Sequence, residues 1–135
     1  MMNVKFQWNG IKVDGELYRC YYTKGPYTAT SKIPEGTITL YAKDYSRFPA
    51  VEGIHVENES DIMTDYFETD RIRIFPGTKY YDEACKALKA HEIHTAKNAL
   101  KHFEKQYQKH VGTRHEGFYQ KELEASRQRL EALTA

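Results

Sequence analysis

The feature that most constrains the fold is a single change of hydrophobic period at Pro76-Gly77. Before this dipeptide, short segments alternate apolar and polar residues, which is the period of a β-strand with one buried face. After it, apolar residues recur every three or four positions, which is the period of an amphipathic helix. The pattern therefore predicts an α+β chain, with a β-rich N-terminal half and a helical C-terminal half.

The N-terminal half is expected to form an antiparallel sheet of about five strands. Alternation marks the segments 4–8, 11–13, 16–23, 37–42, 53–57 and 71–75. Asn9-Gly10 and Asp14-Gly15 separate the first three segments and predict two tight hairpin turns, in which both central residues take positive φ. The segment 16–23 is apolar on both faces, which is typical of a central strand or of one that a helix also covers.

The C-terminal half is expected to form a long helix over 78–109, with Thr78 as its N-cap, and a second helix over 118–133. The apolar face of the first helix consists of Cys85, Ile93, Ala96, Leu100, Phe103 and Tyr107. The apolar stripe of the second consists of Tyr119, Leu123, Ser126, Leu130 and Leu133. Because the connection is short, we expect an antiparallel hairpin. The 135 residues fit one α+β domain, 1–135, with a β-rich part (1–77) and a helical hairpin (78–135).

Composition argues against several classes of protein. The 20 basic and 19 acidic residues leave a net charge of +1, which provides no global field for binding nucleic acid or membranes. No apolar run approaches the roughly 20 residues of a membrane helix, and the N-terminus lacks a signal-peptide pattern. Cys20 and Cys85 belong to no Cys-x-x-Cys motif. We expect a cytoplasmic protein with two free thiols and no cofactor, although a Cys20–Cys85 disulfide stays open.

Motifs that accompany catalysis are missing. There is no Gly-x-Ser-x-Gly elbow, no phosphate loop and no dinucleotide fingerprint, so we expect a binding protein and not an enzyme. His91 and His94 are three residues apart, whereas zincins place their histidines four apart. A metal held by this pair together with His102 or a loop residue is an alternative; we favour solvated histidines and no metal site.

The most acidic stretch of the chain, residues 57–70, contains no basic residue. It lacks the residue order of an EF-hand loop, so a calcium site is not expected. A solvated loop is one interpretation. The other is a segment that enters the basic groove of a protein partner, with aromatic side chains as anchors. The candidate partner-binding residues are Glu57, Glu59, Asp61, Asp65, Tyr66, Phe67, Glu68 and Asp70.

A second candidate surface follows the predicted long helix. Its lysines recur every four residues and wind slowly around one side, with His94 nearby. This face predicts either an ordinary solvated surface or direct binding to nucleic-acid phosphates. The residues concerned are Lys97, Lys101, Lys105, Lys109 and His94. The predicted first helix is also longer than the second, so a homodimer formed through the helices is a further alternative.

Residues 64–74, TDYFETDRIRI, resemble a stretch found in small accessory proteins of phages and other mobile elements. A compact, Tyr-rich chain with one acidic segment and no catalytic motif is also similar to anti-defence inhibitors, including anti-CRISPR proteins. The resemblance implies a regulator that occupies a nucleic-acid groove of a host nucleoprotein enzyme or blocks its movement. It assigns no role to individual residues, because those inhibitors share no common motif.

Overall fold

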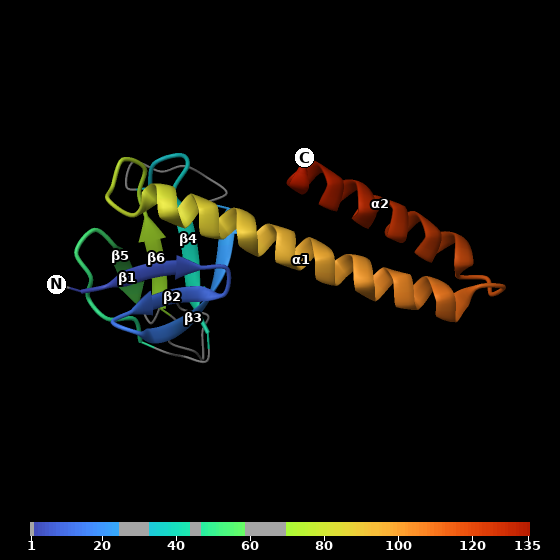
Figure 1. Cartoon of the computed structure of the whole chain (residues 1–135), viewed down its shortest axis with the longest axis horizontal. Helices are drawn as coiled ribbons and strands as arrows, with labels where there is room; N and C mark the ends of the chain where they lie inside the picture. The colour runs from blue at the N-terminus through green and yellow to red at the C-terminus, as the bar shows by residue number, and fades with distance from the viewer. Residues whose placement is uncertain (1, 25–32, 44–46, 59–69) are drawn as a thin grey trace. The chain divides into compact units, whose positions relative to one another are not determined.

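The computed structural model describes residues 2–24, 33–43, 47–58 and 70–135 (Figure 1). Within these ranges lie six strands and two helices, so the α+β prediction is confirmed and the sheet has one strand more than the expected five or so. The elements are β1 (Val4–Gln7), β2 (Gly10–Val13), β3 (Glu16–Lys24), β4 (Ile38–Ala42), β5 (His55–Asn58), β6 (Asp70–Ile74), α1 (Tyr81–His110) and α2 (Glu116–Thr134).

The chain divides into two compact units, Met1–Leu88 and Lys89–Ala135. The boundary falls inside α1, whose first turns belong to the first unit and whose remainder belongs to the second. The single domain over 1–135 stays a prediction. Each unit is described by itself below.

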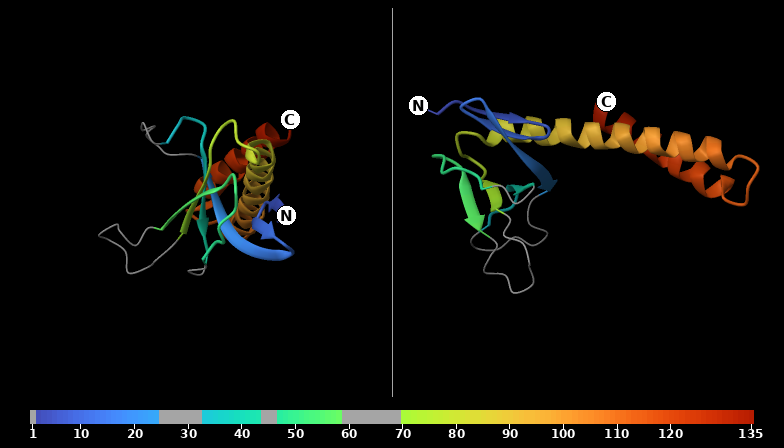
Figure 2. Two further views of the ribbon diagram at one scale, coloured as in Figure 1. Left: turned by 90° about the vertical axis from the view of Figure 1, so that its left-hand side faces the viewer. Right: turned by 90° about the horizontal axis from the view of Figure 1, so that it is seen from below.

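The first unit is built on one antiparallel sheet with the strand order β1-β2-β3-β4-β6-β5. Register aligns Tyr22 with Leu40 and Leu40 with Ile72, so three neighbouring strands contribute one continuous apolar row. The sheet curls around the first turns of α1, where Ala84 and Ala87 complete the core (Figure 2). Small side chains on this helix allow it to approach the sheet closely.

Only one of the two apolar faces of β3 is buried. β3 lies between β2 and β4 and is therefore central, as one reading of the pattern predicted. Cys20 and Tyr22 face the core, with 1% and 5% of their surface exposed. Tyr21 faces the other way and is 53% exposed, with the ammonium group of Lys43 4.0 Å from its ring centroid.

One of the two predicted hairpin turns forms at the predicted residues, and the other is displaced. Asp14 and Gly15 have φ of 50° and 86°, as the prediction requires for the turn between β2 and β3. The first turn is displaced by one residue, because Gln7 pairs with Gly10 and leaves Trp8 and Asn9 as the loop. Gly10 is needed for a different reason: a Cβ there would lie 2.2 Å from the carbonyl oxygen of Tyr18 in β3.

The predicted N-cap at Thr78 is also wrong, because α1 begins at Tyr81. Thr78 instead forms a preceding turn: its hydroxyl donates to the carbonyl of Phe75 at 2.7 Å, and its own carbonyl accepts from the N–H of Tyr81 at 3.2 Å. The hydroxyl of Tyr81 then donates to the carbonyl of Gly36 at 2.7 Å. These bonds fix the start of α1 on the first unit.

The second unit is the helical hairpin formed by the rest of α1, the connection 111–115 and α2, which confirms the predicted helix pair (Figure 1). The hydroxyl of Thr113 in the connection donates to the carbonyl of His110 at 2.7 Å. The His110 ring stacks on the ring of Tyr119, with their centroids 4.8 Å apart. Ala96 and Leu123 are the buried apolar residues described in this unit. The other members of its predicted stripes are half-buried: Ile93, Leu100, Phe103, Tyr107, Tyr119, Ser126, Leu130 and Leu133.

Candidate binding surfaces

The acidic segment connects two adjacent strands. β5 ends at Asn58 and β6 begins at Asp70, and these two residues are paired in the antiparallel register. β5 therefore ends and β6 begins at the same end of the strand pair. Six of the predicted partner-binding residues lie outside the described residues, namely Glu59, Asp61, Asp65, Tyr66, Phe67 and Glu68. Glu57 and Asp70, the two ends of the stretch, are described.

Asp70 is part of the internal structure of the first unit. Only 4% of its surface is exposed. One carboxylate oxygen accepts the backbone N–H of Phe48 at 2.8 Å, and the other accepts from the guanidinium group of Arg47 at 3.0 Å. Since both oxygens are used, Asp70 holds the 47–48 segment against β6. The structure shows no exposed surface through which this carboxylate could contact a partner.

Glu57 belongs to a different network, which is formed by side chains of β5 and β6. Its carboxylate lies 3.0 Å from the imidazole of His55 and 3.4 Å from Nε of Arg73. Burial alone would raise the pKa of Glu57, but the hydrogen bond with His55 and the charge of Arg73 outweigh it and hold that pKa below its ordinary value. Glu57 is therefore ionised at neutral pH, and its side chain is 41% exposed.

Arg73 is the cation that Glu57 balances. It is only 3% exposed, and its guanidinium group also donates to the hydroxyl of Thr39 at 3.1 Å. A buried arginine requires such partners, because transferring an unpaired charge out of water is costly. Alternation in 71–75 placed Arg73 opposite Ile72 and Ile74, but nothing in that pattern indicates burial. The pairing with Glu57 was missed, because it depends on a strand pairing that alternation does not specify.

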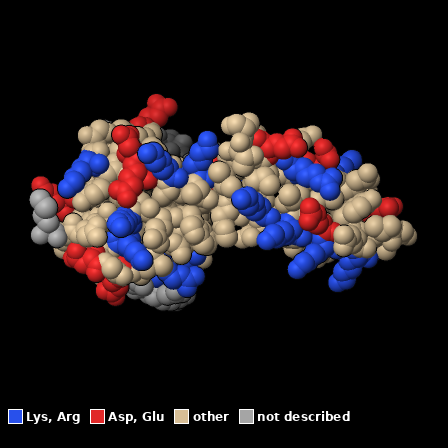
Figure 3. Space-filling model, viewed as in Figure 1, with Lys and Arg blue, Asp and Glu red and all other residues tan. Residues whose placement is uncertain are grey.

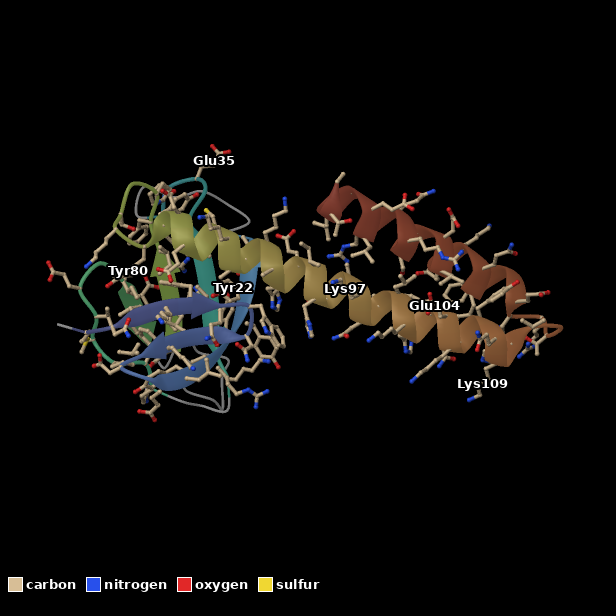
Figure 4. All side chains as sticks on the ribbon, viewed as in Figure 1. Tyr22, Glu35, Tyr80, Lys97, Glu104 and Lys109 are labelled. Atoms are coloured by element: carbon tan, nitrogen blue, oxygen red, sulfur yellow. The ribbon has the colours of Figure 1, made fainter. Side chains whose placement is uncertain are left out.

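The lysine face of α1 is fully described. Lys97, Lys101, Lys105 and Lys109 are all exposed. In Figure 3 basic side chains gather along the part of α1 that belongs to the hairpin, and in Figure 4 Lys109 points away from α2. Among the described residues, none of these four ammonium groups lies in an ion pair. His94 is half-buried and its Nε2 lies 3.1 Å from the side-chain nitrogen of Asn98, one turn along the helix.

Two grooves run between α1 and α2 within the hairpin. The larger, about 420 Å³, is lined by Glu104, Tyr107 and Gln108 from α1 and by Gln120, Leu123, Glu124 and Arg127 from α2. The smaller, about 220 Å³, is lined by Ala96, Ala99 and Phe103 and by Glu122, Ala125, Ser126 and Arg129. The larger groove has two carboxylates and one guanidinium group on its walls, and the smaller has one of each.

Within the part of the chain that the structure describes, no group of three His, Cys, Asp or Glu side chains could hold a metal ion, and no helix is long and apolar enough to cross a membrane. Cys20 and Cys85 are both free thiols. Burial raises the pKa of Cys20 to about 12, so this thiol is not a nucleophile at neutral pH.

No protein-family model, no curated protein and no solved structure matches this chain.

Proposed function

We propose that this chain is a binding protein without catalytic activity, which regulates or inhibits a nucleic-acid-binding enzyme by docking on it through the acidic segment. The observation that carries the proposal is how the acidic segment is attached to the fold. The strand residues on either side of it are paired, and the carboxylates of Glu57 and Asp70 are bound by other residues of the first unit. Docking is therefore assigned to the carboxylates between them: Glu59, Asp61, Asp65 and Glu68.

The proposed mechanism is competition for a positively charged groove. A run of carboxylates complements the lysines and arginines with which such a groove holds phosphates, and this complementarity speeds association. Tyr66 and Phe67 supply aromatic anchors, the residue class that dominates the energy of many interfaces. The resemblance of 64–74 to accessory proteins of mobile elements supports a host nucleoprotein enzyme as the target, as for anti-CRISPR proteins.

The test is a charge reversal with a matched control. The triple variant Asp61→Lys, Asp65→Lys, Glu68→Lys should lose the partner in a pull-down from host lysate that includes nuclease treatment. The control triple, Glu35→Lys, Glu52→Lys, Glu131→Lys, makes the same change of net charge at exposed sites elsewhere. Partner capture by the control, with loss in the acidic-segment variant, is the expected result. Equal capture by both variants would refute docking through this segment.

A second function, direct binding to nucleic acid, is favoured by one observation: four of the exposed lysines of α1, Lys97, Lys101, Lys105 and Lys109, have no ion-pair partner among the described residues. Four phosphate contacts would lower affinity roughly 50- to 150-fold between about 50 and 200 mM salt. Replacing Lys101, Lys105 and Lys109 by Gln should remove most of that dependence, whereas the same change at exposed Lys5, Lys86 and Lys121 should not. An affinity that is flat over this salt range excludes this function.

A further inference from the structure

One face of α2 carries opposite charges in a symmetric arrangement. Glu122 and Arg129 stand equally far from the midpoint between Ala125 and Ser126. They are seven residues apart, which is about 10.5 Å along the axis and nearly two full turns, so they share a face but cannot pair within one helix. Neither takes part in an ion pair among the described residues. Both line the smaller groove of the hairpin.

This arrangement is self-complementary. When two identical helices pack antiparallel around a two-fold axis, each residue lies opposite the residue at the same distance on the other side of the axis. With the axis at the midpoint between Ala125 and Ser126, Glu122 faces the partner's Arg129, and Arg129 faces the partner's Glu122. The same operation places Phe118, which is 58% exposed, opposite the partner's Leu133.

The residues near that axis allow the two helices to approach. Ala125 and Ser126 are small, and the α1 wall of the same groove is formed by Ala96, Ala99 and Phe103. Short side chains at the centre, a charge pair on each side and a large apolar side chain at the end form an ordered interface. Such an interface fits a second copy of this chain, because each charged side chain meets its opposite only when α2 packs antiparallel to an identical helix.

The hairpin also has apolar surface to cover. Of its described residues, only Ala96 and Leu123 are buried apolar residues, and the rest of its apolar stripes are half-buried. Helices in proteins owe most of their stability to packing of such stripes. A second hairpin would convert the pair of helices into a four-helix bundle, in which these stripes form a common core.

We propose that the chain forms a two-fold symmetric dimer through its helical hairpin, with α2 antiparallel to the partner's α2 and ion pairs between Glu122 and the partner's Arg129. The proposal is independent of docking through the acidic segment, because it concerns a different surface. Salt screens the ion pairs, so dimerisation weakens as ionic strength rises.

The decisive experiment uses two variants of the full chain, each studied alone and mixed. Glu122→Arg makes this face wholly positive, and Arg129→Glu makes it wholly negative. Each variant alone should dissociate at a concentration at least about tenfold above wild type in sedimentation equilibrium, since like charges then face each other. An equimolar mixture should restore a one-to-one heterodimer, because each wholly positive face meets a wholly negative one.

Matched control variants exist on the other side of the same helix. Glu124 and Arg127 line the larger groove and are symmetric about the same midpoint, but they are three residues apart, where they can pair within one helix. Glu124→Arg and Arg127→Glu should leave the wild-type dimerisation unchanged. Circular dichroism of every variant reports whether the helices remain folded. A wild-type chain that stays monomeric across the concentration series overturns the proposal. So does a dimer that the Glu122 and Arg129 variants leave intact, or a mixture that fails to associate.

Discussion

The carboxylate of Glu83, in the first turn of α1, accepts a hydrogen bond from the backbone N–H of Phe6 at 3.1 Å. β1 is at one end of the strand order, so one side of its backbone has no neighbour among the strands that the structure describes. An unpaired strand edge invites pairing with another chain. Glu83 occupies one of these edge donors, and the rings of Phe6 and Tyr80 lie 5.8 Å apart beside it. The bond therefore joins the helix to the sheet and protects the sheet edge.

Replacing Glu83 by Ala should lower the free energy of unfolding by about 1–2 kcal/mol, because the N–H of Phe6 then loses a charged acceptor. Urea denaturation measures this loss. Asp82→Ala is the control, since Asp82 also lies in the first turn and contributes to the helix dipole, worth about 0.3–1 kcal/mol, but makes no bond to β1. Equal losses in the two variants would show that the dipole, and not the bond to Phe6, is what matters.

Asp70 should behave as a structural residue when it is replaced. Asp70→Ala leaves the N–H of Phe48 without an acceptor and removes the partner of Arg47, so we expect a loss of about 2–3 kcal/mol in the free energy of unfolding. Asp70→Asn retains one acceptor oxygen and should lose less. Glu52→Ala, at an exposed site, should change stability little and serves as the control. A loss below about 0.5 kcal/mol for Asp70→Ala would contradict the structural role.

The sequence predicts local structure here far better than it predicts long-range contacts. Alternation and helical period located all the described strands and helices within three residues of their ends, because both signals are carried by neighbours in the chain. Asp70 looked like its acidic neighbours, since its partners Arg47 and Phe48 are more than twenty residues away. The burial of Arg73 likewise depends on Thr39 and Glu57, which only the order β4-β6-β5 brings alongside it.

Gly10 and Gly15 should differ in their tolerance of Ala. At Gly10 a Cβ would lie 2.2 Å from the carbonyl oxygen of Tyr18, so the β2–β3 pairing must shift, and we expect a loss of at least about 2 kcal/mol. At Gly15, with φ of 86°, nothing lies within 4 Å of an added Cβ. There only backbone strain opposes Ala, at a cost of about 1 kcal/mol. Thermal or urea unfolding of the two variants tests the difference, and equal losses would contradict the close approach at Gly10.

The thiol of Cys20 should make stability depend on pH in the alkaline range. It is 1% exposed, and burial raises its pKa to about 12 from an ordinary value of 9.0. Its sulfur lies 3.3 Å from the carbonyl oxygen of Tyr18, to which the S–H donates. The unfolded chain therefore loses this proton near pH 9, whereas the folded chain keeps it. The contribution is complete below pH 9 and is lost as pH rises towards 12, with a slope of about 1.4 kcal/mol per pH unit.

Two measurements on Cys20 separate this effect from general alkaline denaturation. Urea unfolding between about pH 8 and 10 should show a falling stability in wild type and a flatter profile in Cys20→Ala, despite the lower stability that lost packing gives this variant. In a Cys85→Ser background, a thiol reagent should label Cys20 only as fast as the protein opens, because the folded thiol is neither exposed nor ionised. Rapid labelling of the native protein, or identical pH profiles for wild type and Cys20→Ala, would contradict the burial of this thiol.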